Sequence, residues 1–146
     1  YISTTQITDA TLNNLFDNVS GDENAASDVE YRCIFVHNAH ASLTWQSVVA
    51  WLSAEVTGGA NAAIAIDGVA ASAIGATAAQ ADEVANEGTA PTGEAFSSPT
   101  TKATGLSIGD LAAGSCRAIW VRRSAANTAA LDNDGVTVRA EGDTGA

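Results

Sequence analysis

The sequence has few groups with which to bind a polyanion. Only six of its 146 residues are Lys or Arg, against seventeen Asp and Glu, and Lys102 is the single lysine. A nucleic-acid surface needs clustered basic side chains that displace counterions from the phosphates, and an anionic membrane surface attracts basic segments. The net charge of −11 therefore predicts no nucleic-acid partner and no membrane partner, and it favours solubility of the free protein.

Large apolar residues are also scarce. Hydrophobic residues make up 46% of the chain, but many of them are alanines, and aromatic residues make up only 5%. No apolar run approaches the ~20 residues that cross a bilayer, so we expect no membrane-spanning segment. A chain of this length can still bury one hydrophobic core. The few large side chains must then be concentrated in short runs, which we interpret as strands.

The motifs of common enzyme families are missing. The sequence contains no GxSxG, P-loop, GxGxxG or HExxH motif and no paired-cysteine zinc site, so we expect neither catalysis nor a cofactor. Its two cysteines, Cys33 and Cys116, lie far apart in strand-like runs and match no metal or redox spacing. They can form a disulfide or remain two buried thiols, and the packing role of small buried cysteines favours the thiols.

Two short segments carry potential metal ligands. His37 and His40 are close enough to share an ion, but no spacing suggests a third ligand. Residues 132–135, Asp-Asn-Asp-Gly, resemble the start of a calcium loop, but the Glu that closes an EF-hand is missing. Asp and Asn before Gly also form ordinary turns. We therefore expect hydrogen-bonding histidines, a turn at residues 132–135 and no bound metal.

Short runs rich in β-branched and aromatic residues predict an all-β fold. The strands are expected at residues 29–38, 43–56, 61–67, 106–111, 115–123 and 135–141. Residues 43–56 fit a helix as well as a strand, and their Thr, Val and Trp content favours a strand. Residues 29–38 have apolar side chains on both faces, which indicates a strand covered on both sides. We expect a single β-sandwich, Ig-like or jelly-roll-like, over residues 29–146.

The first 28 residues are predicted to form a polar N-terminal arm. A few apolar residues of the arm fall near helical spacing after the possible caps Thr8 and Asp9. They are Ile7, Leu12, Leu15, Phe16 and Val19. The spacing predicts a short amphipathic helix, followed by a loop at residues 20–24. A helix of about ten residues is marginal in water alone. We therefore expect Leu12, Leu15, Phe16 and Val19 to dock on a neighbouring subunit or shell protein. Packing on the chain's own sandwich is the alternative.

Half of the basic side chains lie in one predicted strand. Arg122 and Arg123 end the run at residues 115–123 and, as neighbours in a strand, point to opposite faces. They either neutralise local carboxylates at a solvated strand end or pair with carboxylates of a neighbouring subunit. Both are therefore included among the candidate interface residues.

Two blocks of the sequence are similar, in this order, to blocks of a known protein family. Residues 28–38 have the pattern D-x-E-Y-R-C-x-[FY]-V-x-N, and residues 118–123 read Ala-Ile-Trp-Val-Arg-Arg. Over residues 15–145 the chain resembles small virion-associated proteins of tailed bacteriophages. The resemblance implies a virion structural protein, assembled in the host cytoplasm, that decorates or cements the capsid surface. It also implies a homo-oligomer whose partners are the major capsid protein or other virion proteins.

Other binding roles remain open at this point. A tail, connector or filament subunit fits the same resemblance. A carbohydrate- or surface-binding sandwich would need exposed aromatic side chains beside carboxylates. Trp45, Trp51 and Trp120 instead lie in apolar runs typical of a core.

Overall fold

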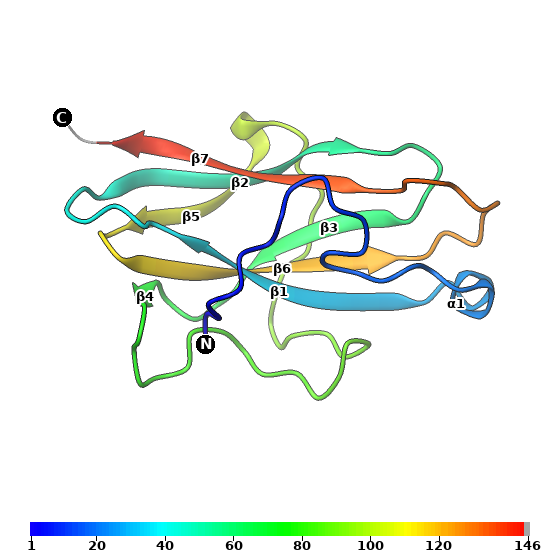
Figure 1. Ribbon diagram of the computed structural model, residues 1–146, viewed down its shortest axis with the longest axis horizontal. Coiled ribbons are helices and arrows are strands. Elements are labelled where there is room, and N and C mark those ends of the chain that lie inside the picture. Colours follow the sequence, from blue (N-terminus) through cyan, green and yellow to red (C-terminus); the bar gives the residue numbers. More distant parts are fainter. Residues whose placement is uncertain (145–146) are drawn as a thin grey trace.

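Two antiparallel sheets pack face to face in the computed structural model, which describes residues 1–144 (Figure 1). The elements, in chain order, are α1 Gly21–Ala26, β1 Val29–His37, β2 Trp45–Glu55, β3 Asn61–Ile66, β4 Ser72–Ala73, the 3₁₀ turn η1 Lys102–Thr104, β5 Leu106–Leu111, β6 Ser115–Ser124 and β7 Val136–Thr144. The predicted β-sandwich is confirmed. Residues 145–146 of the predicted domain lie outside the described part of the chain. Within that part, no helix is both long and apolar enough to span a bilayer.

Strand β6 is the centre of the first sheet. It pairs antiparallel with β1 and with β3, and the short β4 also pairs with it. Its side chains alternate between the two faces, with Ile119 and Val121 on one and Ala118 and Trp120 on the other, and all four are buried. A strand that is apolar on both sides needs a covering layer on each face of its sheet.

Strand β2 is the centre of the second sheet, between β5 and β7. Val48, Ala50 and Leu52, spaced by two residues, are buried toward the first sheet. The register with β5 shifts around Val48, where the opposing residue Gly109 has a φ of +86° that favours glycine. The segment that fitted a helix as well as a strand is thus a strand, as predicted.

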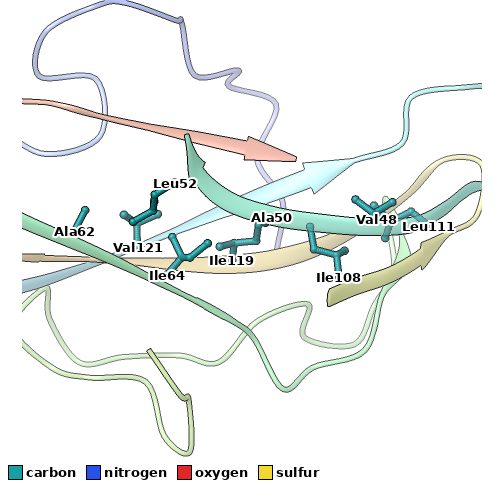
Figure 2. Packing of buried hydrophobic residues seen from close by; sticks show 9 residues of the cluster. All are labelled: Val48, Ala50, Leu52, Ala62, Ile64, Ile108, Leu111, Ile119 and Val121. Atoms are coloured by element: carbon teal, nitrogen blue, oxygen red, sulfur yellow. The ribbon is translucent and has the colours of Figure 1, made fainter. Parts of the chain in front are cut away.

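The core lies between the two sheets (Figure 2). Its buried apolar side chains are Val48, Ala50 and Leu52 of β2, Ala62 and Ile64 of β3, Ile108 and Leu111 of β5, and Ile119 and Val121 of β6. The side chains that β1 and β7 contribute, among them Ile34 and Val138, are only partly buried. The sandwich is therefore well closed around β2 and β6 and more open along the side where β1 and β7 are the edge strands.

The long segment between β3 and β5 covers the outer face of the first sheet. In Figure 1 the green part of this segment runs below β1 and β6, and its last part, in yellow-green, rises to the second sheet. The indole Nε1 of Trp120 donates to Asp67 Oδ2 at 2.7 Å, and the rings of Tyr31 and Phe96 meet edge to face at 5.4 Å. The backbone N–H of Tyr31 also donates to the Glu87 carbonyl at 2.7 Å. The first sheet is therefore covered on both faces, as its sequence pattern requires.

The helix predicted within the arm is wrong. No helix forms over residues 1–20, where Ala10 and Asn13 have φ values of +55° and +57°, which no α-helix contains. The helix is instead α1, in the segment expected to be a loop. Its start is a capping box in which Ser20 Oγ accepts the Glu23 N–H at 3.2 Å and the Glu23 carboxylate accepts the Ser20 N–H at 2.6 Å. Local capping, rather than apolar spacing, decides where this helix forms.

Candidate functional site

The arm is fastened to the sandwich by an aromatic ring between two guanidinium groups. Phe16 lies against Arg32 of β1 and Arg123 of β6, with ring-to-guanidinium distances of 5.3 Å and 4.8 Å. Each such cation–π contact contributes about 0.5–1 kcal/mol at a partly exposed site. Leu15 and Phe16 also pack against the core at its open side. The short segment Leu15–Asp17 is therefore one point of attachment, which we call the anchor. The first two residues form a second one, because the Tyr1 hydroxyl donates to the Thr77 carbonyl at 2.8 Å and the Ile2 N–H donates to Gln80 Oε1 at 3.1 Å.

A buried carboxylate orients Arg123, the β6 arginine that contacts the anchor. Glu30 is buried and directly opposite Arg123 in the register of β1 and β6, and its Oε2 accepts from Arg123 Nε at 2.7 Å. The same guanidinium donates to the carbonyl of Asp17 and, at 3.3 Å, to its carboxylate. Arg32 Nε donates to the Leu15 carbonyl at 3.2 Å. The two strands thus hold the backbone of the anchor through side chains whose positions the sheet determines.

Beyond the anchor, the arm leaves a wide groove beside the sandwich. Among the described residues, residues 3–14 make hydrogen bonds only with one another. The groove has a volume of about 1810 Å³ and lies between this stretch, the first half of β7 and the loop before β7. Four of its large apolar side chains are exposed: Leu12 by 65%, Ile7 and Leu131 by 41% each, and Val56 by 39%. Apolar side chains gathered in one concave surface mark an interaction site more often than single exposed ones.

The floor of the groove is the open side of the core. Ile34 of β1 and Val136 and Val138 of β7 line it, and all three pack against the buried cluster. Within residues 1–144, β7 pairs with β2 alone, so its other edge carries unpaired backbone groups. The groove therefore offers both apolar surface and backbone hydrogen-bonding groups.

The rim of the groove is acidic. Five carboxylates line it, from Asp9, Asp17, Glu55, Asp132 and Asp134, against the two guanidinium groups of Arg123 and Arg139. Two of the carboxylates already accept backbone N–H groups, Glu55 from Ala62 and Asp134 from Ala60. Asp9 and Asp132 are exposed. The surface around the apolar floor is therefore negatively charged.

The structure brings five of the six predicted interface residues to this groove. They are Leu12, Leu15, Phe16, Val19 and Arg123. Arg122 is elsewhere, because neighbouring residues of a strand face opposite sides, and its guanidinium lies 5.3 Å from the Phe96 ring on the outer face of the first sheet. Whether any of the six contacts a neighbouring subunit stays a prediction. Val56, Leu131 and Val138 were not predicted as site residues, because no spacing along the chain relates them to the arm.

Of the residues considered as metal ligands, His37 is the last residue of β1, and its buried Nε2 has no hydrogen-bond partner among the described residues, so the role expected for it is not observed. The others lie in turns and loops. His40 Nδ1 accepts the N–H groups of Ser42 and Leu43 at 3.1 and 2.9 Å, which is the expected hydrogen-bonding role. Asp134 Oδ2 accepts the Ala60 N–H at 2.6 Å and so joins the loop before β7 to the turn before β3. Asp and Asn commonly hold turns in this way.

A cluster of three carboxylates, which the sequence analysis also missed, lies at the end of β3. Asp67, Asp82 and Glu94 each place an oxygen within 4.8 Å of the others, an arrangement that can hold a cation. Asp67 nevertheless accepts three N–H groups and Glu94 Oε1 accepts the Gly68 N–H at 2.7 Å. These bonds hold the covering segment in place. The three residues are 27 positions apart at most, and no local spacing points to the cluster.

Neither cysteine is prepared for nucleophilic chemistry. Both thiols are free, with Cys116 buried and Cys33 half-buried. Burial raises the pKa of the Cys33 thiol to about 12, and burial also raises the pKa of Cys116. Since the thiolate is the reactive form, these environments suit packing rather than catalysis.

Comparison with protein-family models, with curated proteins and with solved structures finds no match to this chain. With no relative to indicate a function, the groove is the candidate binding site of the chain. Trp51 and Trp120 are buried, so they offer no face on which a sugar ring can stack, and Trp45 packs against the core but is only partly buried.

Proposed function

We propose that the chain is a virion structural protein that decorates or cements a capsid by docking through the groove beside its arm. One observation carries the proposal: large apolar side chains are left uncovered in a concave surface next to an unpaired strand edge. A surface of this kind is stabilised when a partner covers it. The resemblance of residues 28–38 and 118–123 to virion-associated proteins supplies the setting.

The exposed apolar surface contributes to binding but is not sufficient for it alone. Full burial of a Leu or Ile side chain contributes about 1.5–3 kcal/mol, and Leu12, Ile7, Leu131 and Val56 are already 35–61% covered. Their further burial therefore contributes on the order of 1 kcal/mol each. This energy must first offset the loss of translational and rotational freedom. Repetition over a symmetric shell compensates for weak single contacts, because linked sites act together.

The charge of the chain supports the same role. A net charge of −11 keeps free copies apart in solution before assembly. The contacts that attach a copy to a particle then have to be made with a surface that is not itself strongly acidic.

The test is the location of the chain in purified particles. Particles released by the organism that encodes it are purified through a density gradient and probed with an antibody against the chain. We expect the chain to travel with the particles and to label their surface in electron micrographs. A chain that is abundant in the cells but absent from every particle fraction would overturn the proposal.

A truncation assigns the attachment to the groove. A variant that lacks residues 1–14 keeps the anchor and loses only the hydrogen bonds of Tyr1 and Ile2 to Thr77 and Gln80, so its melting temperature is expected to fall only slightly. It loses the wall of the groove that carries Ile7 and Leu12 and is expected to be absent from particles. Removal of residues 1–19 is the matched control, since it also removes the anchor and is expected to lower the melting temperature. If the shorter truncation still occupies particles fully, attachment does not use the groove.

A further inference from the structure

We infer that the groove binds an extended segment of a different protein, in which apolar residues alternate with Lys or Arg, and that this segment adds as a strand to the free edge of β7. The inference rests on the proposed docking role of the groove. It does not depend on the identity of the particle. Strand addition supplies affinity through main-chain hydrogen bonds and specificity through alternate side chains.

The free edge of β7 borders the groove and is the one available to such an addition there. In β5, the other outer strand of the second sheet, the Ile108 carbonyl already accepts from Arg117 at 2.8 Å. The edge strand β3 is bridged at Ile64 by Ser97, and the edge strand β1 receives the Glu87 carbonyl at Tyr31. Among the described residues, β7 has no backbone partner besides β2. Natural proteins protect open edges with charges or bulges, and the second half of β7 follows this rule with alternating charged residues. The first half, Val136–Val138, carries none and faces the groove.

The position of the apolar side chains in the groove requires a bound segment in which apolar and polar residues alternate. Side chains of a β-strand point alternately to opposite faces. On one face, a strand beside β7 would contact the side of the core exposed at Val136, Val138 and Ile34. The same side chains would be enclosed by Leu12 and Leu131, which are now uncovered. Every second residue of the occupant should therefore be apolar.

The charge of the rim determines the remaining residues of the occupant. Side chains on its other face would point toward solvent and the rim, where carboxylates outnumber guanidinium groups by five to two. Asp9 and Asp132 are exposed there. Lys or Arg at these positions complements the rim, whereas Asp or Glu would be repelled.

A second copy of the chain does not meet this description. Each of its six basic side chains already contacts a carboxylate, a carbonyl group or an aromatic ring of the same chain. Arg32 pairs with Glu87, Lys102 with Glu141, Arg117 with two carbonyls, Arg122 with Phe96, Arg123 with Glu30 and Arg139 with Trp51. Two copies would also bring together two acidic rims. The occupant is therefore a protein of different composition.

The experiment uses a synthetic probe with the intact chain. The probe is a seven-residue peptide of alternating Lys and Val with blocked ends, and its partner is the ¹⁵N-labelled protein. We expect a dissociation constant below about 1 mM, with amide shift changes concentrated at Val136–Val138 and Leu131. A peptide with Glu in place of Lys is expected to bind at least about tenfold more weakly. Equal binding of the two peptides, or no binding of the first, would overturn the inference.

Backbone methylation tests the strand addition itself. Successive N–H groups of a strand point to opposite edges, so only one set of alternate N–H groups can pair with β7. Methylation of that set should abolish binding, whereas methylation of the other set should leave it nearly intact. If both methylated peptides bind as well as the parent, the groove captures side chains only and the strand model is wrong.

Matched protein variants locate the site. Leu12→Lys combined with Leu131→Lys places like charge in the groove and should weaken binding of the Lys/Val peptide at least about tenfold. Leu43→Lys combined with Ile74→Lys is the control, because these side chains are exposed by 41% and 49% outside the groove. Equal loss in both variants would overturn the location.

Two further experiments complete the test: neutralisation of acidic residues at the rim, and measurement of the oligomeric state of the free chain. Asp9→Asn with Asp132→Asn should weaken binding about threefold or more at low salt, and Glu83→Asn, outside the groove, should not. Sedimentation that shows a dimer dispersed by the Leu12→Lys and Leu131→Lys changes would mean that the occupant is a second copy, which contradicts the inference. Particle occupancy tests the virion role separately, since peptide binding can succeed while the chain is absent from particles.

Discussion

Asp67 fastens the covering segment to the outer face of the first sheet, and its replacement by Asn should destabilise the domain by about 2–3 kcal/mol. The side chain is fully buried directly after β3. Its Oδ1 accepts the Val69 N–H at 2.7 Å, and its Oδ2 accepts the Asp82 N–H at 2.9 Å and the Trp120 indole N–H at 2.7 Å. Three segments distant in the sequence therefore meet at one carboxylate.

An amide of the same size cannot keep all three hydrogen bonds. If the Asn oxygen accepts from Asp82 and Trp120, its NH₂ group faces the Val69 N–H, and two donors oppose each other. A buried donor without an acceptor costs about 1–3 kcal/mol, and bonds to a charged group contribute more than neutral ones. Removal of a buried charge offsets part of this loss. A net loss of about 2–3 kcal/mol lowers the melting temperature of a domain of this size by about 10 °C.

Urea unfolding followed by circular dichroism measures the effect. Asp82→Asn is the matched control, because Asp82 donates to Asp67 through its backbone N–H, which the substitution retains. Its stability should lie within about 0.5 kcal/mol of the intact chain. A double-mutant cycle that combines Asp67→Asn with Trp120→Phe isolates the bond to the indole.

Two results would refute this account of Asp67. One is an Asp67→Asn variant that unfolds at the same urea concentration as the intact chain. The other is an Asp82→Asn variant that loses as much stability as Asp67→Asn. If calcium also raised the melting temperature and a chelator reversed the rise, Asp67, Asp82 and Glu94 would be cation ligands rather than acceptors for the covering segment.

Three further predictions concern other buried or capping groups. Glu30→Ala should cost about 3–5 kcal/mol in urea unfolding, because it leaves the Arg123 guanidinium without its buried partner. In the native protein, Cys33 should react with iodoacetamide at pH 8 about 1000-fold more slowly than a free cysteine, since a pKa of about 12 leaves little thiolate. The hydrogen bonds from Ser20 lower the pKa of Glu23 below its ordinary value of 4.5. The charged Glu23 carboxylate therefore stabilises the folded chain above that pH, and this stabilisation is lost as the pH falls through the lowered pKa. The carboxylate accepts from the Ser20 backbone N–H, so the stability difference between the intact chain and Glu23→Gln should shrink in acid.

Each of these predictions has a control and a contradicting outcome. Glu87→Gln, at an exposed partner of Arg32, should change stability by less than about 0.5 kcal/mol, and an equal loss in Glu30→Ala and Glu87→Gln would contradict the role of burial. Cys33 should react rapidly in urea, and rapid reaction in the native state would contradict its raised pKa. A Glu23→Gln difference that stays constant from pH 7 to pH 3 would contradict the contribution of the Glu23 carboxylate.

Local sequence patterns were sufficient to predict most of the strands. The run Val29–His37 and the run Ser115–Ser124 combine β-branched residues with apolar groups on both faces, and such runs are stable only inside a covered sheet. Those patterns predicted the sandwich. They also favoured a strand over a helix at residues 43–56, where β2 forms over Trp45–Glu55. They failed in the arm, where helical spacing at Leu12–Val19 suggested a helix. Spacing alone cannot form a helix when a stronger local cap, Ser20 with Glu23, lies next to it.

Part of the groove was also predictable. Leu12, Leu15 and Phe16 are large apolar residues in a polar segment, so the sequence alone indicated that they need a surface to cover them. Arg123 was recognisable as one of two neighbouring arginines at a strand end. The sequence could not show that Phe16 and Arg123 contact each other, because their positions are 107 residues apart and no local rule relates them.

What the sequence determined by itself is most of the strands, the polar arm and the acidic character of the chain, since these depend on composition and on spacing between near neighbours. Only the tertiary structure decided that β1 and β7 form the open side of the sandwich, that the arm crosses it, and that Asp67 meets Trp120. Apolar burial is non-directional, so a pattern shows that a side chain should be covered without showing by what. The pairing of strands distant in sequence determines which residues cover each apolar side chain, and it thereby determines where the groove lies.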